Sequence, residues 1–389
     1  MTLVDFFGDI PYTEAFQGAD NLNPVADSGA SVYAAAIALL DGAITNFNND
    51  ALGNPALDMY YDGDWAAWTK AANTLKMKAY MATRLVDGSA VSKFNAIVAS
   101  GNYISSNADD MQFKWGTLAV QPDSRHPRYR SSYTSTGGGS YMSNSLMNYM
   151  WGEGYFSPSY DPRINFYYSR QVARTPGIDA DADEEVLECG LQNPPAHYAG
   201  YVFCGAERGY WGRDHGNDNG IPPDGFLRAL AGVYPAGGLL DDWNVLFNGP
   251  QPQKDGAGNG GNGITPIILA SGSDFMIAEA ALFVDGDITA SGNAMLSGIA
   301  KSFDKVTNFS PLSDLYVGVT NGNFGGLDQM ISDFTEDIVD QWTATDMDGK
   351  KNILANQFFV SQYGNGLNTY NFYRRTGYPT TLQPNIEAN

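Results

Sequence analysis

The residues best suited to catalysis or metal binding are three histidines and two cysteines in a chain of 389 residues. His126, His197 and His215 are not spaced as zinc ligands, and the HExxH and GxSxG signatures of metalloproteases and hydrolases are absent. Each histidine is therefore predicted to be a structural hydrogen-bonding residue. Cys189 and Cys204 lie in one loop-like stretch and could form a disulfide that clips it, which would fit an exported protein.

Carboxylates are abundant, but no local pair marks a catalytic acid and base. The acidic run at residues 181–185 is typical of a solvated loop. Residues 179–190 begin like an EF-hand but lack its central glycine and final glutamate, which excludes that motif. No cofactor motif is present, since the glycine-rich residues 255–263 lack the lysine that ends a phosphate-binding loop. The only metal prediction is a weak calcium site at Asp214, Asn217 and Asp218.

Aromatic side chains offer a different chemistry, because the apolar CH faces of sugar rings stack on Trp and Tyr while polar neighbours bind the hydroxyls. The middle of the chain places several aromatics among Gly, Pro, Asn and Asp residues. The predicted glycan-binding residues are Trp115, Trp151, Tyr155, Tyr160, Tyr210, Trp211 and Trp243. For Tyr210 and Trp211 a structural alternative stays open, in which both rings pin a loop beside residues 213–215.

The formal charge of −21 excludes nucleic acid as a general partner, because only 22 Lys and Arg face 43 Asp and Glu. The same acidity favours a neutral polysaccharide such as a β-glucan over an anionic one such as alginate. A local patch of Arg125, Arg128 and Arg130 could reverse that preference. No apolar run is predicted to span a membrane.

The elements that must position these residues form three zones. Residues 27–100 and 266–378 are predicted to be paired helices, whereas residues 102–265 are rich in Gly, Pro and Tyr and are predicted to be loops with short elements. Ser28 or Ser31 can cap a helix whose apolar stripe runs from Val32 to Phe47, and Asp64 can cap a second helix. Further helices are predicted at 91–98, 275–282, 294–303, 327–342 and 352–363. The expected fold is a single, mainly α domain over residues 1–389, with a helical scaffold and a loop-rich central insertion.

Several segments resemble, in order, the recurring blocks of the SusD/RagB family of Bacteroidetes. The scaffold blocks are residues 7–15 (FGDIPYTEA), 63–76 (GDWAAWTKAANTLK), 270–281 with Glu279-Ala280, and 371–379 (NFYRRTGYP). The central blocks are residues 123–127 (DSRHP), 161–163 (DPR), 194–198 (PPAHY), 212–216 (GRDHG) and 221–225 (IPPDG). Single blocks are weak signals, but the ordered set is specific.

The resemblance implies a scaffold of tetratricopeptide-like helix pairs and a binding face lined by an arc of aromatic residues. It implies a lipid-anchored glycan-binding protein of the outer membrane that acts as a lid on a SusC-type TonB-dependent transporter. Family members carry a lipoprotein signal, a lipidated cysteine and further helix before the segment that resembles residues 7–15. The resemblance therefore predicts that the full-length protein has these features, and that part of the aromatic arc lies there.

Three functions follow as hypotheses from different classes. The first is capture of a polysaccharide or oligosaccharide without catalysis and without a cofactor. The second is a glycoside hydrolase or lyase, because two opposed carboxylates can be brought together by the fold. The third is a structural adaptor of the transporter that has no ligand of its own.

Overall fold

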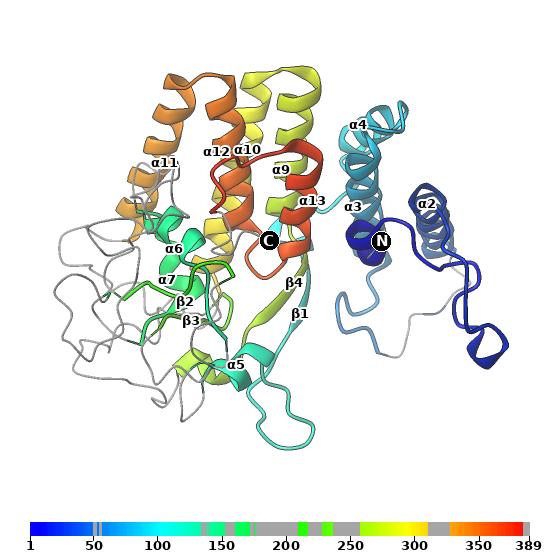
Figure 1. The fold of residues 1–389 in the computed structure, drawn as a ribbon, viewed down its shortest axis with the longest axis horizontal. Coiled ribbons are helices and arrows are strands. Elements are labelled where there is room, and N and C mark those ends of the chain that lie inside the picture. The colour runs from blue at the N-terminus through cyan, green and yellow to red at the C-terminus, as the bar shows by residue number, and fades with distance from the viewer. Residues whose placement is uncertain are drawn as a thin grey trace. The chain divides into compact units, whose positions relative to one another are not determined.

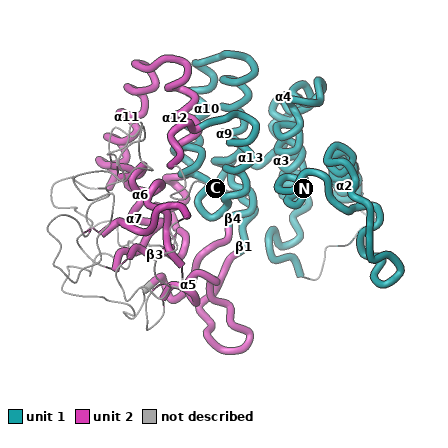
Figure 2. Tube along the Cα trace, in the orientation of Figure 1, with its two compact units in different colours: residues 1–113, 266–301, 357–378 teal, residues 114–265, 302–356, 379–389 magenta. Residues whose placement is uncertain are grey.

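The computed structural model describes residues 1–49, 53, 57–133, 138, 140–151, 160–171, 175, 209–216, 228–235, 257–309 and 327–383. Within them the chain is mainly helical, as the sequence predicts (Figure 1). The chain forms two compact units, each assembled from separate stretches (Figure 2). Unit 1 comprises residues 1–113, 266–301 and 357–378, and unit 2 comprises residues 114–265, 302–356 and 379–389. Part of the C-terminal helical stretch, residues 302–356, groups with the central stretch in unit 2, and the single domain over residues 1–389 stays a prediction.

Unit 1 is organised around helix α3 (Trp65–Thr83), which packs against α2 (Gly29–Phe47) and α4 (Ala90–Ser100) (Figure 1). Helices α9 (Ala270–Ala280) and α13 (Gly366–Thr376) also contact α3. Shorter elements of this unit are α1 (Thr2–Phe7), the 3₁₀ turns η1 (Gly18–Asp20) and η2 (Asn107–Asp109), and the π-helical turn η6 (Ala281–Asp285). Helices α10 (Ile288–Thr307) and α12 (Met347–Ser361) each run from one unit into the other.

Both predicted helix caps are present. Ser28 accepts a hydrogen bond from the Ser31 N–H at 3.2 Å and so begins α2. The Asp64 carboxylate accepts hydrogen bonds from the N–H groups of Ala66 and Ala67 at 2.8 and 3.1 Å and so begins α3. These caps satisfy backbone donors that have no partner inside the helix, which fixes where each helix starts.

The core of unit 1 joins helices that are far apart in the sequence. Met77 and Met81 of α3 pack with Phe94 of α4 and Ala280 of α9 in one buried cluster. Apolar burial of this kind contributes about 25 cal/mol per Å² of surface removed from water. Helix α3 lies at the centre of this core, because it contacts α2, α4, α9 and α13.

Helix α2 departs from its sequence prediction in two ways. Only Val32 of its apolar stripe is fully buried, and Leu39 is 66% exposed, because α2 packs mainly along α3. Near its end the Phe47 ring stacks on Trp65 with ring centroids 5.2 Å apart. By length and composition alone, α2 is also long and apolar enough to cross a membrane. This finding corrects the prediction that no apolar run of the chain is long enough to do so. Core helices of soluble proteins and signal sequences meet the same criterion.

Unit 2 combines short elements with one long helix. Strand β2 (Tyr168–Ser169) pairs antiparallel with β3 (Leu230–Ala231), so that Tyr168 lies opposite Ala231. A separate two-stranded sheet pairs β1 (Met111–Lys114) with β4 (Ile264–Ile268), and most residues of both strands belong to unit 1. The helical elements of unit 2 are α5 (Pro127–Ser132), α6 (Asn144–Trp151), α7 (Ile164–Tyr167), the 3₁₀ turn η5 (Ala257–Gly261) and α11 (Leu327–Ala344).

Candidate functional site

Three of the predicted glycan-binding residues meet in unit 2. Trp151 is the last residue of α6, and its indole packs edge-on against the Tyr160 ring with centroids 5.3 Å apart and planes at 89°. The Tyr210 ring lies 5.9 Å from the same indole. Residues separated by 59 positions in the sequence therefore form one aromatic cluster, which we define as Trp151, Tyr160 and Tyr210.

Asn165 of α7 ties the cluster together. Its side-chain oxygen accepts a hydrogen bond from the Tyr160 hydroxyl at 2.6 Å and another from the Tyr210 hydroxyl at 2.7 Å. Its amide nitrogen donates to the Pro162 carbonyl at 3.2 Å, which fixes the direction of the side chain. Asn165 is not predicted from the sequence, since nothing in an isolated asparagine distinguishes it from a turn residue.

The residues of the cluster and Asn165 differ in exposure to solvent. Trp151, Tyr160 and Asn165 are partly exposed, whereas Tyr210 is 1% exposed. The Arg170 guanidinium lies 4.9 Å from the centre of the Tyr210 ring. The partly exposed layer offers aromatic surface beside a polar amide, which is the combination that a sugar's CH groups and hydroxyls require.

A buried ion pair holds α7 beneath the cluster. Arg163 and Asp161 are both fully buried, and the guanidinium reaches the carboxylate through Nε at 2.9 Å and Nη2 at 2.6 Å. The guanidinium also lies over the rings of Phe303 and Phe334. The Asp161 N–H donates to the Met150 carbonyl at 2.8 Å, so the pair connects α7 to α6. Asp161 thus serves to position α6 and α7.

Trp211 does not offer a ring face to a ligand, because it is fully buried under the Arg228 guanidinium at 4.7 Å. This placement corrects its prediction as a stacking residue and matches the structural alternative. The next residue, Gly212, donates its N–H to Asn144 at 2.7 Å. A Cβ atom at Gly212 would clash with the Met142 carbonyl oxygen, so only glycine fits at this position. Tyr210, also buried, supports the cluster rather than facing solvent.

Trp115 has its own setting at the β1–β4 sheet. Its indole N–H donates to Thr265 at 2.8 Å, and its ring packs edge-on against His126 at 5.8 Å. His126 is buried, and its Nδ1 accepts the Arg128 N–H at 3.0 Å, as expected of a structural histidine. Burial lowers the pKa of His126 to about 4, with the Arg128 charge acting in the same direction against a hydrogen bond to Ile264.

The remaining predictions are placed as follows. Asp214 is buried and accepts hydrogen bonds from Asn144 at 2.8 Å and Gln383 at 3.0 Å, which are structural contacts. Among the residues that the structure describes, no group of three side chains is arranged to hold a metal ion. The other predicted residues, Tyr155, Trp243, Asn217, Asp218, Cys189 and Cys204, lie outside the described residues.

A sequence profile of the SusD-like family, described as starch-binding and associating with the outer membrane, matches residues 1–188. Over these residues the match bears out the resemblance to the SusD/RagB family that the ordered motifs predict from the sequence. No match to the chain was found among curated proteins.

Solved structures show that the fold extends over nearly the whole chain. A SusD homologue from Bacteroides uniformis is 16% identical, with a TM-score of 0.61 over 98% of this chain and 66% of its own. A chitin-binding SusD homologue from Flavobacterium johnsoniae is 18% identical, with a TM-score of 0.60 over 99% and 67%. A SusD-like protein from Bacteroides thetaiotaomicron is 20% identical, with a TM-score of 0.60 over 99% and 68%. The chain therefore spans about two thirds of the length of these relatives.

Proposed function

We propose that the protein captures polysaccharide at the surface of the outer membrane without cleaving it, and that Trp151, Tyr160 and Asn165 form part of the contact surface. The observation that carries this proposal is the aromatic cluster, whose partly exposed rings flank an amide. The family's description as starch-binding and the chitin-binding relative support a glycan as the ligand class. Tyr155, Trp243 and Trp115 stay candidate contacts on the same glycan.

The proposed glycan is neutral, with a β-glucan as the first choice. The chain's charge of −21 disfavours an anionic polymer through repulsion. The arginine patch that could reverse this preference is partly neutralised, because Arg125 forms a bidentate pair with Asp123 at 2.9 and 3.1 Å. Arg128 donates to Ser140 at 3.2 Å. The Asp123 carboxylate offsets the charge of Arg125 and so leaves less net positive charge for a polyanion such as alginate, whereas the neutral Ser140 hydroxyl leaves the charge of Arg128 unchanged.

In this proposal the full-length protein is lipid-anchored and passes the glycan to a SusC-type TonB-dependent transporter. The sequence resemblance and the family's association with the outer membrane support that role. Co-purification of the full-length protein with a SusC-type transporter from the same organism tests the partnership. Transporter that fails to co-purify, while glycan binding is intact, would contradict the partnership alone.

The glycan site is tested by replacing Trp151 with alanine. We expect Trp151→Ala to bind a neutral β-glucan about tenfold more weakly, equivalent to about 1.4 kcal/mol, because the aromatic surface of the cluster is removed. Affinity electrophoresis against β-glucan, starch, chitin oligosaccharides and alginate measures the change. Tyr373→Ala is the matched control, since Tyr373 is 41% exposed on α13 in unit 1.

The outcomes separate the three hypotheses. Equal retardation of wild type and Trp151→Ala removes the cluster from the site. Release of new reducing ends from any of these glycans would favour a hydrolase, and new unsaturated ends would favour a lyase. If no glycan retards the wild-type protein, the structural adaptor becomes the better account.

A further inference from the structure

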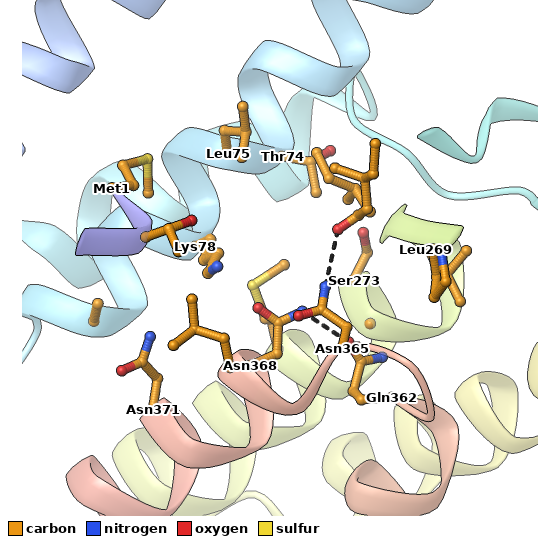
Figure 3. A pocket seen from close by; sticks show the side chains of 18 of the residues that line it. Met1, Thr74, Leu75, Lys78, Leu269, Ser273, Gln362, Asn365, Asn368 and Asn371 are labelled. Carbon is orange, nitrogen blue, oxygen red and sulfur yellow. Dashed lines mark hydrogen bonds between the residues drawn. The ribbon is translucent and has the colours of Figure 1, made fainter. Parts of the chain in front are cut away.

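Unit 1 contains a cavity of about 280 Å³ that none of the predicted glycan-binding residues lines. Its walls come from α3, the junction between β4 and α9, the end of α12, and α13 (Figure 3). The volume lies near the lower end of small-molecule sites, which measure roughly 300 to 1,000 Å³. A ligand of one or two sugar rings is the appropriate size.

Three polar atoms at this cavity have no hydrogen-bond partner. They are the Ser273 hydroxyl on α9, and the Asn371 amide nitrogen and Asn368 carbonyl oxygen on α13. Ser273 is fully buried and Asn371 is 9% exposed. Most buried polar atoms in proteins are paired, so three unpaired atoms at one cavity indicate a missing partner.

Neighbouring amides hold these groups in place. Asn368 donates its amide nitrogen to Gln362 at 2.8 Å, which leaves its carbonyl oxygen as a fixed acceptor (Figure 3). Asn365 donates to the Ile267 carbonyl at 3.2 Å and anchors the loop before α13. In Figure 3, Asn368 and Asn371 rise from α13 towards Lys78 and Leu75 of α3. The cavity therefore presents a hydroxyl, a donor and an acceptor in a preset arrangement.

The charges at the cavity are already paired, which argues against an anionic ligand. The Lys78 ammonium lies 3.5 Å from the buried Asp5 carboxylate. The Arg375 guanidinium donates twice to the Glu279 carboxylate, at 2.6 Å each. A purely apolar ligand is equally unsuited, because it would leave the three polar atoms desolvated and unpaired.

We propose that this cavity is a second binding site, for a small neutral sugar of one or two rings, separate from the aromatic cluster of unit 2. The sugar's hydroxyls supply the partners that Ser273, Asn368 and Asn371 lack. Its CH groups contact the apolar wall at Leu75, Met276 and Phe358. The site needs no part of the polysaccharide surface proposed above.

Saturation-transfer NMR and calorimetry on the whole chain, with glucose, N-acetylglucosamine and cellobiose as probes, test this site. We expect at least one probe to bind wild type. We expect Asn371→Leu and Ser273→Ala each to weaken that binding by about tenfold, because each removes one hydrogen-bonding group. Asn95→Leu makes the same chemical change at an exposed position of α4 and should leave binding unchanged.

A melting curve for each variant shows whether it is folded, and Ser273→Ala is the variant least expected to disturb packing. Trp151→Ala distinguishes the two sites, since it should lose polysaccharide retention and keep the small sugar. No saturation transfer to any probe with wild type, or equal binding by wild type and both folded cavity variants, would overturn the cavity site. If Trp151→Ala no longer binds the small sugar, the sugar binds at the aromatic cluster and not in the cavity.

Discussion

At the scale of single residues, the aromatic side chains of unit 2 fall into two groups: buried rings that hold their segment in place, and partly exposed rings whose surface a ligand could contact. Trp211 and Tyr210 are buried and hold their segment in place, whereas Trp151 and Tyr160 keep part of their surface exposed. Asn165 connects the two layers through its paired hydrogen bonds. The type of residue alone does not decide the role, because burial sets which ring faces solvent.

His126 gives a prediction about pH. Its pKa in the folded protein, about 4, lies below the ordinary value of 6.5, so the unfolded chain takes up the proton first as pH falls. The stability that depends on the neutral ring is therefore complete above about pH 6.5 and is lost progressively towards pH 4. Urea denaturation across this range should show a smaller decline for His126→Asn, which keeps an acceptor for the Arg128 N–H.

His215 provides the control for this experiment, because it is exposed in the folded protein. His215→Asn should keep the wild-type dependence of the denaturation midpoint on pH. Identical pH profiles for His126→Asn and wild type would show that His126 does not contribute to the acid sensitivity.

The sequence anticipates part of the arrangement of aromatic residues in unit 2, and the remaining differences have physical reasons. Trp151 and Tyr160 are predicted as ligand contacts because they lie among polar residues in the middle of the chain; the structure brings the two rings together, and their contact with a ligand stays a prediction. Asn165 was missed because its role depends on two hydroxyls that come from other segments. Trp211 was included because burial cannot be read from a residue's type in a region without periodicity.

At the scale of elements, capping and periodicity predicted the helices well. Asp64 and Ser28 begin α3 and α2 as expected, and the helix predicted at 327–342 is observed as Leu327–Ala344. The pairing of β1 with β4 was not predicted, because the two strands are about 150 residues apart and each is short. Local sequence carries helix signals, whereas strand pairing between distant segments depends on tertiary contacts.

The cap of α3 gives a prediction at this scale. Replacement of Asp64 by alanine leaves the N–H groups of Ala66 and Ala67 without their partner. We expect Asp64→Ala to lower the free energy of unfolding by about 1 kcal/mol. Chemical denaturation measures the change, and Asp64→Ser, which retains a capping oxygen, should recover most of it. A loss of the same size in both variants would contradict the capping role.

At the scale of the whole molecule, one buried carboxylate joins three helices of unit 1. Glu279 of α9 is fully buried and receives Arg84, which directly follows α3, at 3.0 Å and Arg375 of α13 at 2.6 Å. Both arginine side chains are themselves nearly or largely buried. The carboxylate therefore compensates two guanidinium groups that have little access to water.

Removal of this carboxylate should be among the most destabilising single changes in the chain. We expect Glu279→Ala to lower the free energy of unfolding by about 3–5 kcal/mol, because two buried positive charges lose their partner. Lys93→Gln breaks the exposed pair with Asp87 at 3.7 Å and should cost no more than about 1 kcal/mol. Denaturation midpoints compare the two variants, and equal losses would show that burial does not set the strength of these pairs.

The spacing of this three-helix contact also bears on how the protein is made. Arg84 and Glu279 are 195 residues apart, and Arg375 follows Glu279 by a further 96. At a synthesis rate of about 5–20 residues per second, the C-terminal arginine emerges roughly 15–60 s after the first one. During that interval α3 has been synthesised, but α13, which packs against it, has not. We expect the nascent chain to be prone to aggregation until α13 has been translated.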